Sequence, residues 1–312
     1  MPRVSVITAL HDKGAYVAQT IRSVLAQTVP DWEMIVVENG SSDDGPHVVR
    51  QFSDPRLRLV VSPQKGPGAA RNFGYNFATA EWILFLDADD LLAPDYLEER
   101  LGQLQTRPDA NLVVGGWEEF PDGQPDQRTK HFPAGLGGTA NDIADAAIAF
   151  APWVLHAALT RRSRFGPNPA WLEHLDALPY EDAAFWFPIV LGATPVWSEK
   201  TGAFYRLQTA SSRNEIVSMD RTLRGIIGVV AENTRYLQMT GGKPNADQTG
   251  TLVRTFESAY RRALRLGDRQ TAALALKHAS FWLGTRPVHG RSMHVRRRLG
   301  LRLFNLLRFG AI

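Results

Sequence analysis

The sequence predicts an α/β fold: a mostly parallel sheet flanked by helices, followed by a helical C-terminal extension. Three observations lead to this prediction. Short apolar runs alternate with segments of helical periodicity through the first 116 residues. These runs are continuously apolar, as is typical of strands buried on both faces of a parallel sheet. From about Ile216 onward the pattern is helical to the end of the chain.

The expected strands are rich in Val, Ile and Leu, and they are Val4–Leu10, Glu33–Glu38, Leu57–Val61, Trp82–Asp87 and Asn111–Gly116. Helices are expected between them. The apolar residues Val17, Ile21, Val24 and Leu25 have helical spacing, and the segments 43–52, 67–79 and 94–107 also indicate helices. Alternation of strand and helix implies parallel strands joined by right-handed crossovers. Residues 121–141 are rich in Pro, Gly and polar side chains and indicate a long surface loop.

Charge divides the chain into two parts. Residues 1–212 hold 17 Lys and Arg against 26 Asp and Glu, a net charge of −9, whereas residues 213–312 hold 18 against 6, a net charge of +12. We therefore expect a first domain over 1–212, with halves at about 1–116 and 117–212, and a basic helical extension over 213–312. The extension is expected to meet something anionic.

Composition excludes several classes of protein. The chain has no cysteine, so disulfides and thiolate metal sites are excluded and a reducing compartment is expected. The first apolar run is too short for a signal peptide. No window holds 18 uncharged apolar residues, so we expect a protein that is soluble or lies on a surface.

Polar segments follow three of the expected strands: ALHD follows the first, ENGSSDDG the second and DADD the fourth. Ligands of an open parallel sheet bind at the carboxyl ends of its strands, so these segments predict a ligand site. The alternative is that they are turn formers, with Ser42–Asp44 only capping the next helix.

The run WILFLDADDLL ends a buried strand with Asp87, Asp89 and Asp90. Like charges this close repel one another unless a counter-charge is present. In an extended chain Asp87 and Asp89 project to the same side. Their oxygens suit Mg²⁺ or Mn²⁺ completed by substrate phosphates. The alternative, an acidic helix N-terminus, accounts for Asp90 better than for Asp87.

Two further segments suggest binding or catalytic groups. The glycines of KGPGAARNFGYNFA precede a helix whose N-terminus attracts anions, and Arg71 on its first turn could contact a base or a phosphate. An ion pair on the helix surface is the alternative for Arg71. In PYEDAAFWF, Glu181 and Asp182 open an aromatic helix, where a part-buried carboxylate could act as a general base. The alternative is a structural role, in which the two carboxylates interact favourably with the helix dipole.

These residues together resemble family 2 glycosyltransferases of GT-A fold. The resemblance covers about residues 3–212 and depends on the order and spacing of SVLAQT…D.E.IVV..GS.D, G...ARN.G......LDADD, ED about ninety residues later, and YR. It implies an inverting transferase that uses a nucleotide-sugar donor, UDP-linked, and a hydroxyl acceptor on a glycan or a lipid-linked glycan. A haloacid-phosphatase interpretation of DADD would leave the first 80 residues unexplained.

The resemblance also implies the donor site. The walls of the nucleotide pocket would be Ala9, Leu10, His11, Asp12 and Glu38, with Arg71 as the basic contact. The D-x-D motif would be Asp87, Ala88 and Asp89, with Asp89 as the principal ligand of Mn²⁺ or Mg²⁺ and Asp87 beside it.

The resemblance makes Asp182 the catalytic base, with Glu181 beside it. Candidates for acceptor binding lie between the metal motif and the base: Trp153, His156, Trp171 and His174, each with a structural role as an equal alternative. The rival function is a non-catalytic module that holds a sugar nucleotide or anchors a partner. Relatives commonly act in surface-polysaccharide assembly, which implies a cytoplasmic protein, either free or peripheral on the inner face of the membrane.

The last segment, 286–312, holds seven arginines and no acid. Its apolar residues have the spacing of one helix face: Val295, Leu299, Leu303, Leu306 and Leu307. This pattern predicts a helix lying on an anionic membrane surface. The alternative is that the leucines dock on the catalytic domain. Nucleic acid is not expected as a partner, because aromatic residues for base stacking are few.

Overall fold

The computed structural model describes residues 1–133, 139–165, 171–209, 217–285 and 289–309. The chain divides into two compact units. Unit 1 comprises 1–140, 152–177 and 189–215, and unit 2 comprises 141–151, 178–188 and 216–312. The domains predicted over 1–212 and 213–312 stay a prediction, and in the structure the internal segments 141–151 and 178–188 group with the C-terminal helices.

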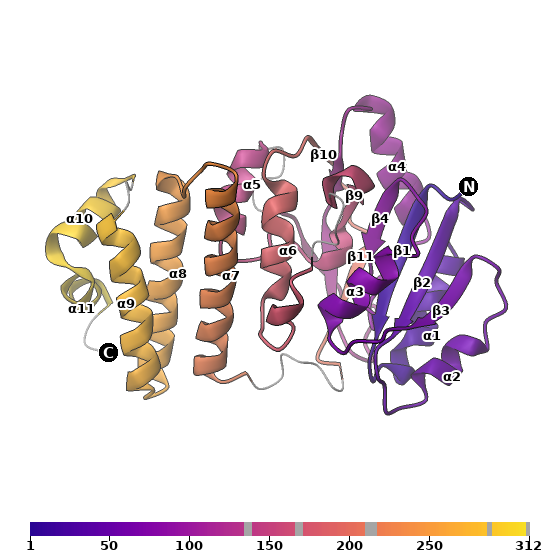
Figure 1. Ribbon diagram of the computed structural model, residues 1–312, viewed down its shortest axis with the longest axis horizontal. Coiled ribbons are helices and arrows are strands. Elements are labelled where there is room, and N and C mark those ends of the chain that lie inside the picture. Colours follow the sequence, from indigo (N-terminus) through magenta and orange to yellow (C-terminus); the bar gives the residue numbers. More distant parts are fainter. Residues whose placement is uncertain (134–138, 166–170, 210–216, 286–288, 310–312) are drawn as a thin grey trace. The chain divides into compact units, whose positions relative to one another are not determined.

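Unit 1 is built on a seven-stranded sheet with strand order β10-β6-β9-β4-β1-β2-β3. Figure 1 shows β3, β2, β1 and β4 side by side. The strands are β1 (Val4–Leu10), β2 (Trp32–Glu38), β3 (Leu57–Val61), β4 (Trp82–Phe85), β6 (Leu112–Val114), β9 (Ala158–Arg161) and β10 (Pro195–Trp197). All pairings are parallel except those of β9, which runs antiparallel to β4 and β6. The predicted fold class is therefore confirmed.

Helices follow the strands as predicted. They are α1 (Gly14–Leu25), α2 (Gly45–Arg50), α3 (Pro67–Tyr75) and α4 (Tyr96–Thr106). In α1 the buried residues include Val17, Ile21 and Val24, which share one face at helical spacing. The parallel register of β1 with β2 and β4 brings the three polar segments to one edge of the sheet.

A second, four-stranded sheet in unit 1 has the order β5-β11-β7-β8. Its strands are β5 (Leu91–Leu92), β7 (Trp117–Pro121), β8 (Thr129–His131) and β11 (Ala203–Leu207). The predicted loop 121–141 is wrong in part, because β8 pairs with β7 inside it. Short 3₁₀ helices at Leu155–Ala157, Arg162–Phe165 and Glu173–Leu175 connect the rest of the unit.

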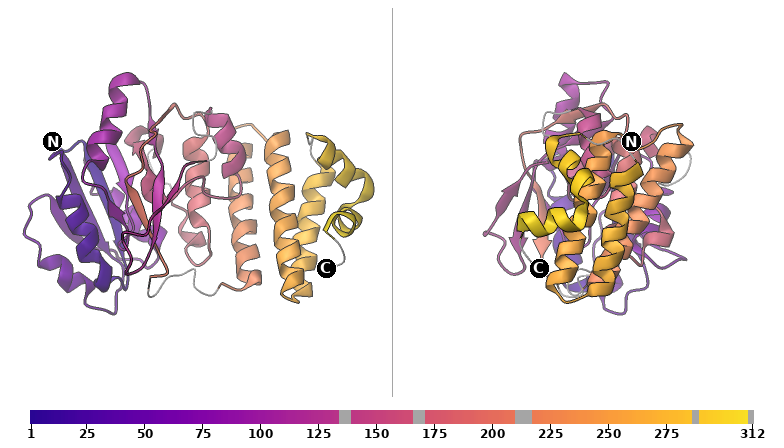
Figure 2. Two further views of the ribbon diagram at one scale, coloured as in Figure 1. Left: turned by 180° about the vertical axis from the view of Figure 1, so that it is seen from behind. Right: turned by 90° about the vertical axis from the view of Figure 1, so that its left-hand side faces the viewer.

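Unit 2 is helical. Its elements are α5 (Ala140–Ala147, of which the first residue belongs to unit 1), α6 (Glu181–Val190, of which the last two residues belong to unit 1), α7 (Met219–Met239), α8 (Ala246–Arg265), α9 (Arg269–Thr285), α10 (Arg291–Leu299) and α11 (Leu301–Phe309). Helices α7, α8 and α9 lie side by side in Figures 1 and 2. Helix α8 begins with a capping box formed by Asn245 and Gln248. The helical C-terminal part is as predicted.

The arginine-rich tail forms two helices instead of the single helix predicted. The break is at Gly300, whose φ of 74° is in the left-handed region that favours glycine. Buried Met293, Leu301 and Phe304 form the packed face of the tail. The prediction of a single continuous helix is therefore wrong, and the side chains of Leu303 and Leu307 in the predicted apolar face lie outside the described residues.

A buried ion pair also holds the tail. The Arg296 guanidinium lies 2.9 Å from the Glu257 carboxylate of α8, and both side chains are more than nine-tenths buried. Asn305 donates to the same carboxylate at 3.1 Å. Val295, Leu299 and Leu306 remain exposed. Among the residues that the structure describes, no helix is both long enough and apolar enough to cross a membrane.

Candidate functional site

Unit 1 contains a cavity of about 570 Å³ at the carboxyl ends of β1, β2 and β4. We call it the main cavity. Its lining combines carboxylates with cationic side chains: Ala9, His11, Lys13, Asn39, Lys65, Gly66, Pro67, Arg71, Asp87, Ala88, Asp89, Tyr205, Arg206, Leu207, Gln208 and Thr209.

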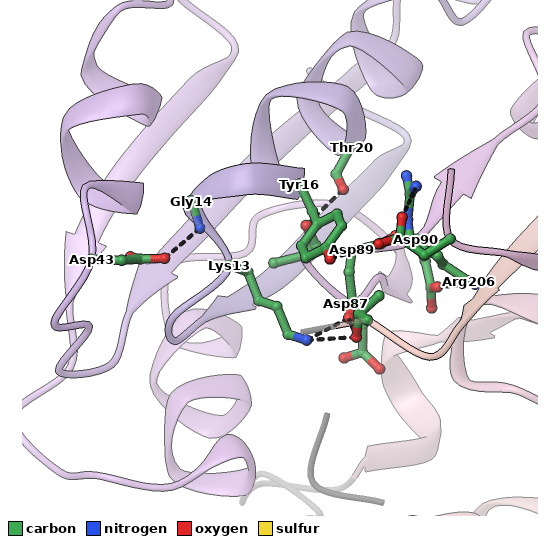
Figure 3. Close-up of polar contacts among 12 residues, drawn as sticks. Lys13, Gly14, Tyr16, Thr20, Asp43, Asp87, Asp89, Asp90 and Arg206 are labelled. Carbon is green, nitrogen blue, oxygen red and sulfur yellow. Dashed lines mark hydrogen bonds and ion pairs between the residues drawn. The ribbon is translucent and has the colours of Figure 1, made fainter. Parts of the chain in front are cut away.

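The segments after β1 and β2 brace each other beside the main cavity. Asp12 accepts hydrogen bonds from the backbone N–H of Ser42 at 2.6 Å and from its hydroxyl at 3.0 Å, and these bonds lower the pKa of Asp12. Asp43 accepts from the backbone N–H of Gly14 at 2.6 Å (Figure 3). A Cβ on Gly14 would lie 2.5 Å from the Asp44 carboxylate, so glycine permits this close approach. Ser42–Asp44 therefore do more than cap the next helix.

Asp87, Asp89 and Asp90 lie in a tight turn after β4, where the Asp90 N–H donates to the Asp87 carbonyl at 3.2 Å. The predicted extended chain is wrong here, yet Asp87 and Asp89 both line the main cavity. Two contacts fix the turn: the Thr20 hydroxyl donates to the Ala88 carbonyl at 2.9 Å, and Arg206 Nε donates to the Asp89 carbonyl at 2.8 Å. The carboxylates are thus held by the backbone of the turn, not by strand alternation.

Each cavity carboxylate has a cationic neighbour. Lys13 Nζ lies 2.8 Å from Asp89 Oδ2 (Figure 3), and the Arg71 guanidinium lies 2.6 Å from Asp87 Oδ1. The side chain of Asp89 is 16% exposed and that of Asp87 is 33% exposed. The expected counter-charges are therefore supplied by the chain itself in this state.

Asp90 does not line the main cavity, and its side chain is buried in the interior of unit 1. Its carboxylate lies 3.3 Å from His156 Nδ1, and both side chains are almost wholly buried. Burial raises the pKa of Asp90, with the negative charges of Asp89 and Asp87 adding to the effect. Burial lowers the pKa of His156 to about 4 and outweighs the opposing pull of Asp87 and Asp89. His156 is therefore neutral at neutral pH.

Arg71 is placed by α3 and by a ring beneath it. Its guanidinium lies 4.3 Å from the centre of the Trp171 ring, and Asn72 donates to the Trp171 carbonyl at 2.9 Å. Arg71 is only 5% exposed, so the surface ion pair considered as its alternative is not what the structure shows. Its buried ion pair with Asp87 belongs to the cavity wall.

The N-terminus of α3 already holds an anion from the chain itself. The Asp176 carboxylate accepts from the backbone N–H groups of Gly68 at 2.9 Å and Ala69 at 3.1 Å. A Cβ on Gly66 or Gly68 would collide with this carboxylate, and Gly66 also has a φ of 124°. The predicted anion site is thus occupied by Asp176, which explains the glycines without a phosphate.

The structure brings together most of the predicted donor residues. Six of them line the main cavity: Ala9, His11, Arg71, Asp87, Ala88 and Asp89. Leu10, Asp12 and Glu38 are not part of its lining. Leu10 is fully buried, and both oxygens of Glu38 accept hydrogen bonds from Ser41, at 2.6 and 2.8 Å. Glu38 and Asp12 act here by shaping the loops.

The three main acceptor candidates lie in the interior of unit 1. Trp153, His156 and Trp171 are 2%, 0% and 3% exposed. Stacking on a sugar requires an accessible ring face, so this burial favours the structural alternative for all three. Their role in acceptor binding stays a prediction.

Glu181 and Asp182 open α6 as predicted, and they belong to unit 2. Glu181 is buried and Asp182 is half-buried. The next residues, Ala183 to Phe187, are all buried, so the aromatic part of α6 anchors this turn.

Several residues of the site were not identified from the sequence, above all Lys13, Asn39, Thr209 and Asp176. Asn39 holds the Gly66 turn by accepting from the Gly66 N–H at 2.8 Å. Lys13 could have been identified from the sequence, because it is a polar residue close to the end of the first expected strand. Thr209 and Asp176 reach the site only through contacts across more than 100 residues.

No group of three or more His, Asp or Glu side chains within the described part of the chain could enclose a metal ion. Asp87 and Asp89 nevertheless form an oxygen donor set on one cavity wall, and cationic groups approach both. A divalent ion that takes its remaining ligands from substrate phosphates needs only one or two carboxylates. The residues therefore fit a metal that is completed by substrate.

Comparison with known proteins gives a consistent result. The family described as Glycosyl transferase family 2 matches residues 5–164. The putative teichuronic acid biosynthesis glycosyltransferase TuaG of Bacillus subtilis is 34% identical over 138 residues, which cover 43% of this chain and 55% of TuaG. The Escherichia coli enzyme WfgD, a UDP-Glc:alpha-D-GlcNAc-diphosphoundecaprenol beta-1,3-glucosyltransferase, is 32% identical over 116 residues, covering 37% of this chain and 46% of WfgD. The chain thus spans about half the length of these relatives.

Solved structures share the fold. TarS 1-349 of S. aureus in complex with UDP-GlcNAc aligns with a TM-score of 0.61 at 15% identity and covers 91% of this chain and 92% of that one. The mannosyltransferase PcManGT from Pyrobaculum calidifontis, in complex with GDP-Man and Mn²⁺, aligns with a TM-score of 0.54 at 18% identity, covering 99% and 87%. At these identities the likeness shows the fold alone.

Proposed function

The chain belongs to glycosyl transferase family 2, and we propose that it is an inverting, metal-dependent enzyme that moves a sugar from a nucleotide-sugar donor, UDP-linked, to a hydroxyl of a glycan or lipid-linked glycan. One observation carries the proposal. Asp87, Asp89 and the cationic groups of Lys13, Lys65 and Arg71 line a single cavity at the strand ends of the fold.

The main cavity suits a nucleoside diphosphate. Its volume of about 570 Å³ lies in the range of small-molecule sites. Ala9 and His11 offer a wall for the base and ribose, while Arg71 and Lys65 offer positive charge for phosphates. The complexes of TarS with UDP-GlcNAc and of PcManGT with GDP-Man support the class of donor.

The reaction follows from charge. Mn²⁺ or Mg²⁺, held by Asp89 and Asp87, would stabilise the negative charge that develops on the departing diphosphate. Arg71, fixed between Trp171 and Asp87, adds a positive charge that needs no reorganisation when the bond breaks. Asp182 accepts the proton of the acceptor hydroxyl, whose oxygen attacks the anomeric carbon opposite the leaving group. A single displacement of this kind inverts the configuration.

An enzyme is favoured over a non-catalytic sugar-nucleotide module. The turn that carries Asp87 and Asp89 is held by hydrogen bonds from Thr20 to the Ala88 carbonyl and from Arg206 to the Asp89 carbonyl. The intact Asp87, Asp89 and Asp182 support the catalytic alternative.

Surface-polysaccharide assembly is the setting we propose. The names of TuaG and WfgD, which refer to teichuronic acid and to a diphosphoundecaprenol acceptor, support a glycan or lipid-linked acceptor. Such an acceptor would place the protein in the cytoplasm at the inner face of the membrane.

The tail offers a surface for that contact. Its packed face leaves Val295, Leu299 and Leu306 exposed among several exposed arginines. Exposed apolar side chains beside arginines suit an interface of anionic headgroups. The tail would therefore dock on its own helices through one face and on the membrane through another.

A thermal-shift screen of nucleotide sugars, each with Mn²⁺ and with a chelator, tests the function. A ligand that binds only the folded state raises its melting temperature. We expect one class of donor, UDP-linked, to raise it by several degrees with Mn²⁺ and much less with the chelator. A panel without effect in either condition contradicts the proposal.

A further inference from the structure

The side chains of Lys13, Asp89 and Thr209 contact one another in the main cavity. Its ammonium is 2.8 Å from Asp89 Oδ2 and donates to the Thr209 hydroxyl at 2.8 Å. The Thr209 hydroxyl in turn donates to the same Asp89 oxygen at 2.8 Å. Three segments far apart in the sequence therefore meet at one carboxylate oxygen; Figure 3 shows the lysine reaching the turn.

The backbone holds Lys13 in this position. Its carbonyl accepts from the N–H groups of Tyr16 and Val17 at 3.0 and 2.9 Å, which places it at the start of α1. The following residue, Gly14, is tied to Asp43. The side chain is 14% exposed and passes over the Tyr16 ring, 5.6 Å from its centre. The ammonium is thus directed at Asp89 by a fixed anchor.

A divalent cation at Asp89 requires carboxylate oxygens, and this ammonium already contacts one of them, Oδ2. Two cations bound at one carboxylate within a few ångströms repel strongly, because the interaction scales with the product of their charges and inversely with their distance. Full occupancy by both is therefore unfavourable unless new negative charge arrives. The diphosphate of the donor supplies such charge.

We propose that Lys13 is an exchangeable counter-cation of Asp89, a positioning residue that couples metal binding to donor binding. Before the donor arrives, the ammonium neutralises Asp89 and keeps its metal affinity low. When the donor enters, Asp89 is released to the divalent cation, and the ammonium takes phosphate oxygens as its new partner. The inference deepens the proposed function and depends on it.

The coupling has a definite consequence. Any group that favours metal and diphosphate together, yet opposes the metal alone, produces positive cooperativity between the two ligands. Removal of the ammonium should therefore change the two affinities in opposite directions. A lysine with a purely structural role would weaken both, and a lysine that only binds phosphate would leave the affinity for metal alone unchanged.

The first measurement titrates the full chain with Mn²⁺ alone, with free Mn²⁺ followed by electron paramagnetic resonance. We expect Lys13→Met to bind Mn²⁺ about ten-fold more tightly than the unmodified protein, and Lys13→Arg to remain within about two-fold of it. The matched control is Lys65→Met, since Lys65 lines the same cavity near Gly40. It should also stay within about two-fold. The gain should disappear in the double variant with Asp89→Asn.

The second measurement uses UDP and GDP in parallel at saturating Mn²⁺, by calorimetry. Of UDP and GDP, the one that binds more tightly to the unmodified protein is used for the comparison. We expect Lys13→Met to lower the affinity for this diphosphate about ten-fold, and Lys13→Arg to retain most of it. Melting curves of each variant verify that it is folded.

Opposite changes in the two titrations support the inference. A loss in both, or an unchanged affinity for Mn²⁺ alone, overturns it while leaving the proposed function intact. If the unmodified protein binds neither diphosphate more tightly with Mn²⁺ than without it, the metal-dependent function itself fails, and the inference fails with it.

Discussion

Asp182 and Glu181 are neighbours in the first turn of α6 and differ in burial, which allows their roles to be separated. A general base acts on the acceptor, so its loss slows turnover and spares donor binding. We expect Asp182→Asn to lower kcat by about 10²- to 10⁴-fold with little change in donor affinity. Glu181→Gln is the matched control and should cost far less. The reverse ranking in steady-state kinetics would transfer the role to Glu181.

His156 predicts a pH dependence of stability. Its pKa of about 4 in the folded protein lies below the ordinary value of 6.5, so the unfolded chain binds a proton that the folded chain does not between these values. The contribution is complete above about pH 6.5 and is lost as the pH falls toward about 4, at most about 3 kcal/mol. Denaturant unfolding of the protein and of His156→Gln should show a shallower acid loss in the variant.

The raised pKa of Asp90 acts in the opposite direction. Because the Asp90 carboxylate lies 3.3 Å from His156 Nδ1, the two proteins are compared in an Asp90→Asn background, which isolates the histidine. Identical slopes for the two proteins between pH 6.5 and 4 would show that His156 does not carry the effect.

At this scale the sequence predicted residues that line the main cavity and missed those that hold them in place. Asp87 and Asp89 follow β4 directly, and Arg71 lies near the start of α3 (Pro67–Tyr75), where local pattern indicates a site. The contacts of Asp176 with Gly68 and of Thr209 with Asp89 depend on how the sheet folds, so spacing along the chain could not reveal them.

Among the elements, helix α3 is held at its N-terminus by Asp176 and carries Arg71 in the wall of the main cavity. The Asp176 carboxylate caps the helix, and Trp171 of the same segment lies against Arg71. We expect Asp176→Ala to destabilise the protein by about 2 kcal/mol, because two charge-assisted hydrogen bonds to backbone N–H groups are lost. Donor affinity should also fall, because the segment that supports Arg71 loses an anchor.

Asp95→Ala provides the control for this prediction. Asp95 also precedes a helix, α4, yet its side chain makes no capping hydrogen bond and is 56% exposed. Its loss should cost less than about 0.5 kcal/mol. Equal unfolding free energies for the two variants would refute the role of Asp176.

Prediction of the elements succeeded where the signal was local. The bounds of Val4–Leu10 and Leu57–Val61 agree with the structure, because continuous runs of β-branched and apolar residues end at turn formers. The prediction for the tail was wrong for a nonlocal reason. Arg296 is buried in an ion pair with Glu257, which lies 39 residues away, and helical periodicity cannot show such a partner. Gly300 was a local signal for the break, since glycine is typical just beyond a helix C-terminus.

At the scale of the whole molecule, the acidic first part and the basic tail suggest separate tasks. Cleavage of the chain after Gly284 would remove α10 and α11 together with the Arg296–Glu257 pair and expose apolar surface on α8 and α9. A substitution is therefore a cleaner test than truncation. We expect a variant with Val295, Leu299 and Leu306 all changed to Ser to lose flotation with vesicles of anionic lipid while keeping its fold, because these side chains are exposed.

The control changes three exposed apolar residues elsewhere in the described chain, Val61, Met239 and Leu266, to Ser. It should float as the unmodified protein does. Binding that persists equally in both variants, or that occurs in neither variant nor in the unmodified protein, would remove the membrane role and leave the tail as packing.

Hydrolysis of the nucleotide sugar in the absence of acceptor, measured by the release of nucleoside diphosphate, tests directly whether the protein is a metal-dependent transferase. With the nucleotide sugar found by the thermal-shift screen, we expect the unmodified protein to release diphosphate with Mn²⁺ and to release none after chelation. We expect Asp89→Asn to lower the rate of release by at least about 10³-fold, because the metal ion that stabilises the leaving group loses a charged ligand. Asp95→Asn should behave as the unmodified protein does. Release that continues in chelator, or at an undiminished rate in a folded Asp89→Asn variant, would contradict the account.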